Sequence, residues 1–463
     1  MSFLRERGMG ASVLVAALSS AFGVTLLATT AYLGFLAKTA MGEGGTVGLM
    51  VGILSGIFII IAMYVGAIVT ANTFSTIVAG RTREIALLRL IGSTASAERR
   101  RVAGQGLIVG AIGSAIGLAV GVGIAFAGTA AAGRILDAPA YGDAFQAWMA
   151  LPSVIVVLTT WAAAWGGSRR VLSVTPLQAL GGSVARSHEE ARGGRVRAGF
   201  GIALGLLGTL LLVAGLLLGL FTPLAVVVAF VGGLLSFTAI VLAATAIMPP
   251  VLRLVGRAFG GSATSRMAAE NALRYPERSS RMSIGVVVGV TLVVMFAVAT
   301  ETLEKVLVSG LTAEEADATG VSAFLDLFGG IMMALVGFSA IIAAVGLVNL
   351  LTIGVVQRRT ELGLLRALGL STSQIRRMVL LEAAHITIAS TLLGVVLGVV
   401  YGWIGAQATA GSVAGTPAIV APGVPWAPVT VVLVAMAVLT LLAAVTPTRL
   451  ATRISPVEAL AAD

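Results

Sequence analysis

Residues suited to catalysis or metal binding are few in this sequence. The 463-residue chain has no cysteine and only two histidines, His188 and His385, which excludes disulfides and thiolate metal sites and argues against a histidine-rich metal site. No Gly-x-x-x-x-Gly-Lys-Ser/Thr phosphate loop is present, and the two lysines are Lys38 and Lys305. We therefore predict that the chain is not an enzyme, binds no metal or cofactor itself, and cannot hydrolyse ATP alone.

Glu382 and His385 are the main ionisable residues in a segment expected to cross a membrane. They lie one helical turn apart, and ionisable residues inside a membrane mark proton or ion paths by default. Glu382 also follows Arg376 and Arg377 by less than two turns, so ion pairing near the inner membrane interface is the simpler interpretation. Proton coupling and interfacial pairing both stand as alternatives.

Two similar segments, one in each half of the sequence, carry the most distinctive charge pattern. Residues 81–94 read RTREIALLRLIGST and residues 358–371 read RRTELGLLRALGLS, with six of fourteen positions identical. Arginine and glutamate stand three residues apart in both copies, at Arg81 and Glu84 and at Arg358 and Glu361. Because that spacing puts them on one helical face, where they can form a weak ion pair, each segment is predicted to be a short amphipathic helix.

Each of these short helices is predicted to end in a tight turn. Gly92 and Gly369 fit the position after a helix where the chain reverses with positive φ. The preceding apolar stripes consist of Leu87, Leu88 and Ile91 in the first copy and of Leu364, Leu365 and Leu368 in the second. The helices could lie on the inner leaflet with their arginines on lipid headgroups. Alternatively they dock onto a two-fold cytoplasmic partner, an interpretation that their repetition favours.

A second motif also occurs once in each half of the sequence. The first copy contains Thr175, Pro176 and Gln178, and the second contains Ser455, Pro456 and Glu458. A hydroxyl at the N-cap, proline at the first helical position and glutamine or glutamate at the third form a capping box, which starts a helix. We expect a short cytoplasmic helix at each place and a second contact with a partner.

The elements that must position these motifs are membrane spans. The chain is 58% apolar and 11% charged, with a mean hydropathy of +1.03, whereas soluble domains are about 45–50% apolar and about 25% charged. A bilayer needs about 20 apolar residues as helix. Segments of that kind occur at roughly 11–37, 47–79, 103–127, 148–166, 200–220, 223–248, 283–303, 327–356, 379–405 and 427–447. The sequence therefore predicts an all-α membrane protein with about ten transmembrane helices.

The basic residues indicate which side of the membrane each connection occupies. Of 30 lysines and arginines, 27 fall in segments on one side, which leaves Lys38, Arg134 and Lys305 for the other. By the positive-inside rule both termini lie in the cytoplasm. The net charge of +10 is thereby explained without nucleic acid. The outer connections are short, so no large extracytoplasmic domain is expected.

The repeat divides the chain into two halves of four spans each, residues 1–180 and 265–463. Residues 181–264 are a cytoplasmic linker plus two additional spans, and its polar, Gly-rich part at 181–197 is expected to be flexible. An even number of spans separates equivalent positions, so the halves should share one orientation. The second helices, at 47–79 and 327–356, are predicted to be about 50 and 45 Å long, enough to transmit displacement beyond the bilayer.

Glycines recur in the third helix of each half. Gly117 and Gly121 in the first half correspond to Gly394 and Gly398 in the second, in the same register as the two charged segments. Such a row of small residues is typical of close helix packing.

The strings around 81–121 and 358–398, with the terminal proline motifs, resemble the FtsX-like permease domain of MacB-type ABC transporters. The resemblance covers roughly 48–180 and 328–460. It implies that residues 81–92 and 358–369 are similar to coupling helices that grip an ATPase dimer, and that a lever motion replaces passage through a central pore. The residues carried over are Arg81, Arg83, Glu84, Leu88, Arg89, Gly92, Arg358, Glu361, Leu365, Arg366 and Gly369.

This resemblance implies a permease in a bacterial cytoplasmic membrane. Its expected partners are membrane lipid and two copies of a cytoplasmic ATPase that binds ATP and magnesium. A small accessory membrane or extracytoplasmic protein is a further candidate partner. The expected activity is export or extraction of a hydrophobic, lipid-like or peptide substrate. The alternatives are a non-transporting signal or sensor complex and an ion-coupled secondary transporter, although buried coupling charges are scarce.

Overall fold

The structure, a computed structural model, is helical throughout the part that it describes and shows no strand there. It describes residues 9–41, 91–135, 146–168, 188–258, 263–274, 276–308, 368–412 and 419–427, with scattered positions at 53–88, 364 and 429–438. Within this part, seven helices are long and apolar enough to cross a membrane. They correspond to seven predicted spans; the spans at 47–79, 327–356 and 427–447 lie wholly or largely outside the described residues.

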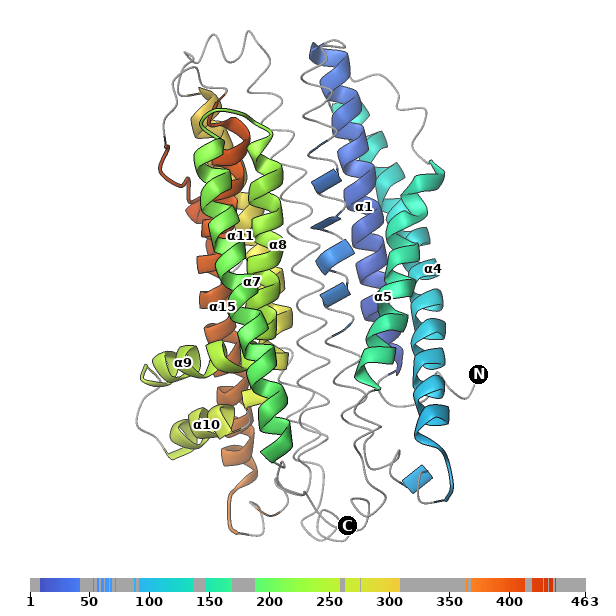
Figure 1. Cartoon of the computed structure of the whole chain (residues 1–463), viewed down its shortest axis with the longest axis vertical. Coiled ribbons are helices and arrows are strands. Elements are labelled where there is room, and N and C mark those ends of the chain that lie inside the picture. The colour runs from blue at the N-terminus through green and yellow to red at the C-terminus, as the bar shows by residue number, and fades with distance from the viewer. Residues whose placement is uncertain are drawn as a thin grey trace.

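The first helical group consists of α1 (Met9–Met41), α4 (Ala95–Ile135) and α5 (Leu151–Gly167), which follows the short 3-10 helix η2 (Ala147–Ala150). These helices pack side by side, on the right in Figure 1. Glycines of α4 bring its backbone against α1. A Cβ at Gly121 would lie 2.8 Å from Val24 Cβ and 2.9 Å from the Ala21 carbonyl oxygen. The predicted close packing is confirmed at this contact.

The second helical group is built around α11 (Pro276–Val308) and α15 (Thr372–Ala410). Here a Cβ at Gly398 would lie 2.6 Å from Val294 Cβ and 2.9 Å from the Thr291 carbonyl oxygen. Gly398 thus contacts Val294 and Thr291 of α11 in the same way as Gly121 contacts Val24 and Ala21 of α1. The internal repeat of the sequence is therefore also a repeat of tertiary packing.

The additional helices α7 (His188–Leu218) and α8 (Ala225–Leu242) pack against each other and against α15. Gly208, Gly215 and Gly232 lie where the α7 and α8 backbones approach closely. The expectation of a flexible linker at 181–197 is wrong for residues 188–197, because α7 already begins at His188.

The sixth predicted span, 223–248, is wrong at its end. Helix α8 stops at Leu242, Ala243 adopts φ −90° and ψ 6°, and α9 (Ala244–Gly256) begins. Helices α9 and α10 (Ala263–Arg274) lie across the lower part of the second group in Figure 1. The buried residues of α9 recur every three or four positions, at Ala244, Met248, Leu252 and Val255. Such an amphipathic helix lies along a protein surface. The sequence-based span extended to residue 248 because the apolar residues of α8 continue into the start of α9.

The longest helices that the structure describes are the third helices of the halves. Helix α4 has 41 residues and α15 has 39, so each is about 60 Å long and exceeds the bilayer. Both begin at the lower end of the view and run to the upper end (Figure 1). The sequence placed long helices at 47–79 and 327–356, which lie largely outside the described residues.

Candidate functional site

The turn before α4 is the first of two candidate coupling sites. Gly92 has φ +104°, the Ile91 N–H donates to the Leu87 carbonyl at 3.2 Å, and the Ser93 N–H donates to the Leu88 carbonyl at 3.0 Å. These bonds end a helix with a left-handed glycine. The Thr94 hydroxyl then accepts from the Ala97 N–H at 3.2 Å. One residue separates the glycine that ends one helix from the hydroxyl that starts the next.

The turn before α15 has the same construction. Gly369 has φ +98°, and the Leu368 N–H donates to the Leu364 carbonyl at 2.9 Å. Ser371 caps α15: its hydroxyl accepts from the Gln374 N–H at 3.2 Å, and its own N–H donates to Gln374 Oε1 at 2.8 Å. The predicted positive φ is thus confirmed at both glycines.

Each turn presents an exposed pair of apolar side chains. Leu87 and Ile91 are 50% and 81% exposed, and their counterparts Leu364 and Leu368 are 50% and 71% exposed. We call these the tip pairs. Leu88 is partly buried. Because exposed apolar side chains that recur at equivalent places mark an interaction surface rather than a core, the tip pairs can bind a protein partner or a membrane surface.

Most of the other predicted coupling and capping residues lie outside the described part of the chain. These are Arg81, Arg83, Glu84, Arg89, Arg358, Glu361, Leu365, Arg366, Thr175, Pro176, Gln178, Ser455, Pro456 and Glu458. Their ion pairs, caps and roles stay predictions. The structure describes Leu88, Gly92 and Gly369 among the predicted residues and assigns the two glycines a conformation.

Sequence reasoning missed the caps and the residues that support the first turn. Ser371 and Gln374 fit the capping-box pattern and could have been found from it. In the first turn, the Ser93 hydroxyl donates to Glu98 Oε1 at 2.8 Å. The Arg99 guanidinium lies 4.3 Å from the centre of the Trp165 ring, a cation–π contact between α4 and α5 that no sequence spacing indicates.

Glu382 and His385 are both buried in α15, whereas Arg376 and Arg377 are exposed. His385 Nε2 lies 2.6 Å from the Leu252 carbonyl oxygen of α9. A carbonyl can only accept, so Nε2 carries the hydrogen. In the described residues, no group of three or more His, Cys, Asp or Glu could hold a metal ion. The geometry favours a structural role for His385 in holding α9.

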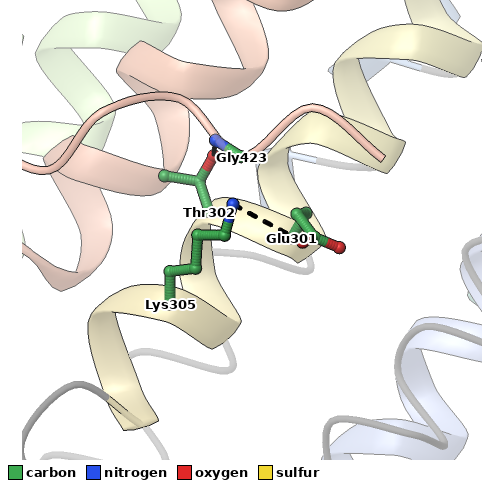
Figure 2. A network of polar contacts seen from close by, with 4 residues as sticks. All are labelled: Glu301, Thr302, Lys305 and Gly423. Atoms are coloured by element: carbon green, nitrogen blue, oxygen red, sulfur yellow. Dashed lines mark hydrogen bonds and ion pairs between the residues drawn. The ribbon is translucent and has the colours of Figure 1, made fainter. Parts of the chain in front are cut away.

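Polar contacts join the segment at 419–423 to the upper ends of α11 and α15, and Figure 2 shows those at α11. The Gly423 N–H donates to the Thr302 hydroxyl oxygen at 3.0 Å, and Lys305 pairs with Glu301 at 3.6 Å. The backbone of Val420 is bound on both sides, since its N–H donates to Gln407 Oε1 and its carbonyl accepts from Trp403 Nε1. These contacts hold the segment at 419–423 against both helices and form no catalytic arrangement among the described residues.

Comparison with known families yields two matches along the chain. The model of the FtsX-like permease C-terminal domain matches residues 56–176 and 333–456, together more than half of the sequence. Each match contains one turn, one tip pair and the third helix that follows. These bounds agree with those expected from the sequence motifs.

Two bacterial relatives are similar over part of their length. The ABC transporter permease YtrF of Bacillus subtilis (strain 168) is 36% identical over 87 residues, which is 19% of this chain and 20% of YtrF. The macrolide export ATP-binding/permease protein MacB of Rhodopirellula baltica is 30% identical over 148 residues, which is 31% of this chain and 20% of MacB. Each alignment therefore spans about a fifth of the relative.

Proposed function

Because the chain belongs to the FtsX-like permease family, we propose that it is the membrane subunit of an ABC transporter and that two copies of a separate cytoplasmic ATPase drive it. It is a multi-pass membrane protein with seven candidate spans among the described residues. The proposed topology has both termini in the cytoplasm, with the halves 1–180 and 265–463 in one orientation around the linker and helices of 181–264. ATP and magnesium bind the partner.

The observation that carries this proposal is the equivalence of the two turns. Both place an exposed apolar pair at the start of a third helix, at matching positions of the internal repeat. A two-fold symmetric ATPase dimer offers two equivalent surfaces, and two equivalent turns fit such a partner. The sequence places arginines in the same two segments, and apolar side chains together with arginines fit the composition of protein interfaces.

The long helices of each half supply the lever: the second helices, predicted at 47–79 and 327–356, and the third helices α4 and α15, which follow the turns. Closing of the ATPase dimer displaces the tip pairs, and α4 and α15 carry that displacement across the membrane. Gly121 and Gly398 hold these helices close to α1 and α11, so each pair tilts as a unit. The tilt changes an outward-facing lateral cleft, through which a hydrophobic, lipid-like or peptide substrate leaves the membrane.

Substitution of the tip pairs tests the coupling site. We expect Ile91→Asp combined with Leu368→Asp to abolish co-purification of the ATPase, because charged side chains would replace two apolar contacts of the interface. Leu254→Asp is the matched control, since Leu254 is 64% exposed on α9 but lies outside the turns. Wild-type amounts of ATPase with the double variant would contradict the assignment.

Flux measurements separate transport from the two alternatives. In proteoliposomes, ATP-dependent export with the ATPase present supports a transporter. Flux driven by an ion gradient without ATP would instead indicate a secondary transporter. Stimulated ATP hydrolysis without flux would indicate a signal or sensor complex, which could use the same lever.

A further inference from the structure

An apolar cavity of about 200 Å³ lies among α7, α8, α11, α15 and the second predicted helix. Its walls include Ile57, Ile61 and Val65 from the second helix, Phe230 from α8, and Leu292 and Met295 from α11. The site joins elements of both halves with the additional pair α7 and α8. A cavity of about 150 Å³ with similar lining accommodates benzene in a soluble protein, so this one holds a short stretch of hydrocarbon.

The two tyrosines of the cavity wall direct their hydroxyls to α8. The Thr238 hydroxyl donates to the Leu234 carbonyl at 2.6 Å, so it accepts from Tyr64 at 2.7 Å. The Ser236 hydroxyl likewise donates to the Gly233 carbonyl at 3.1 Å and accepts from Tyr401 at 2.9 Å. Both phenol hydrogens are thereby used within the protein.

The threonines at the upper end of the cavity are also satisfied by their own helices. The Thr300 hydroxyl donates to the Phe296 carbonyl and the Thr409 hydroxyl to the Gly405 carbonyl. Thr291 also lines the cavity, and its buried hydroxyl has no partner among the described residues. A polar ligand atom would therefore find this single hydroxyl in a wall that is otherwise apolar or already hydrogen-bonded. Because an unpaired polar group in an apolar site is costly, the cavity favours a ligand segment without polar atoms.

The cavity lies toward the end of the bundle where α11 and α15 finish. On α15 it extends from Tyr401 to Thr409, and that helix ends at Ala410. Several wall residues, including Phe230, Thr300 and Leu303, are partly exposed, so the cavity is not sealed inside the protein. In the proposed topology this level is the outer leaflet, and the ligand enters sideways from lipid.

We propose that this cavity binds one acyl chain of an outer-leaflet amphiphile, with the chain end beside Tyr64 and Tyr401. The assignment names the substrate class of the permease and rests on the function proposed above. The second predicted helix forms one wall, so a shift of the first half relative to α8 and α15 changes the width of the cavity. The lever motion would thereby tighten the cavity around the acyl chain or release the acyl chain from it.

Photolabelling in nanodiscs tests the proposal. The probe is phosphatidylglycerol with a diazirine near the end of one acyl chain. Gly405 lines the cavity, and a Cβ there would meet nothing within 4 Å, so Gly405→Leu fills the cavity without displacing backbone. Gly128 is the equivalent position in the first half and is also open. Gly128→Leu is therefore the matched control, and leucine is a better helix former than glycine.

We expect light to label α11 and α15 around the cavity in wild-type protein. Gly405→Leu should lower this labelling about tenfold, the effect of losing burial for roughly two methylene groups, whereas Gly128→Leu should leave it unchanged. Equal labelling of wild-type protein and Gly405→Leu overturns the proposal. So does labelling confined to the exposed face of α7.

Two further measurements identify the molecule that supplies the acyl chain and separate the acyl-chain proposal from the ATPase-coupling proposal. Competition by an unlabelled palmitoylated peptide would identify a lipidated substrate and support the assignment. Lack of competition would identify a resident phospholipid, which supports acyl-chain binding but overturns its assignment to the substrate. ATPase co-purification is measured on the same samples. Failed labelling with normal co-purification rejects the acyl-chain assignment alone, whereas failed co-purification with normal labelling rejects the coupling.

Discussion

Gly92 and Gly369 keep the two turns in a conformation that other residues resist. Both have a positive φ, and a Cβ at either position would meet no neighbouring atom. The constraint at these residues is therefore the backbone conformation and not space. A side chain in the left-handed region costs roughly 1–2 kcal/mol, with asparagine tolerated better than other residues.

Substitution of these glycines should follow that order. We expect Gly92→Ala and Gly369→Ala each to lower the free energy of unfolding by about 1 kcal/mol, and the asparagine variants to lower it less. Thermal unfolding in detergent, followed by tryptophan fluorescence, measures the change. Gly104→Ala serves as the control, because Gly104 lies inside α4 with open space for a Cβ; it should stabilise the protein. Equal values for alanine and asparagine would refute the backbone explanation.

Among the helices, α9 depends on the elements that clamp it. Its first carbonyl, at Ala244, accepts from the Ser280 hydroxyl of α11 at 3.0 Å, and its Leu252 carbonyl accepts from His385 of α15. Its interior prolines, Pro249 and Pro250, contribute no backbone N–H. These contacts from α11 and α15 fix α9 across the second helical group.

Removal of the His385 contact should loosen α9. In His385→Leu we expect the amides of α9 to exchange hydrogen about tenfold faster, since a lost hydrogen bond corresponds to about 1.4 kcal/mol. Hydrogen–deuterium exchange with mass spectrometry measures this change. Thr387→Val is the control in the same helix, because the buried Thr387 hydroxyl has no partner among the described residues. Unchanged exchange in both variants would mean that His385 does not hold α9.

How much of these elements the sequence could predict depended on the kind of signal. The repeat and the positive φ of Gly92 and Gly369 were predictable, because they depend on local identity and spacing. The break at Ala243 was not, since the apolar run continues past it and hydropathy does not register a change of direction. The polar first turns of α4 and α15 were also not predicted, because a search for apolar segments does not include them. Thr94 and Ser371 nevertheless mark the starts of these helices as N-cap residues. The tyrosine contacts with α8 join residues far apart in the chain, which no local pattern encodes.

For the molecule as a whole, the side of the membrane on which each turn lies decides whether one ATPase dimer can contact both turns. The lever requires both turns in the cytoplasm and the α7–α8 connection outside. The distribution of basic residues predicts this arrangement. Helices α4 and α15 run in the same direction in Figure 1, which supports it.

Single-cysteine labelling can test the sidedness, because the chain has no cysteine of its own. Ser96 and Ser373 are exposed at equivalent positions of the two halves, and Phe221 is 78% exposed between α7 and α8. We expect a membrane-impermeant maleimide to label Ser96→Cys and Ser373→Cys only from the cytoplasmic face and Phe221→Cys only from the opposite face. Labelling of the two serine positions from opposite faces would reject the lever.

The position of α7 and α8 beside α15 makes the protein unequal on its two sides. The described part of the chain contains one such pair beside two similar halves, and the hydroxyls of Tyr64 and Tyr401 both bond to the same helix, α8. In the function proposed above, two equivalent ATPase contacts therefore act on a single acyl-chain site. Under the proposed function, we therefore expect one substrate molecule per chain in each transport cycle, although the two ATPase contacts are equivalent.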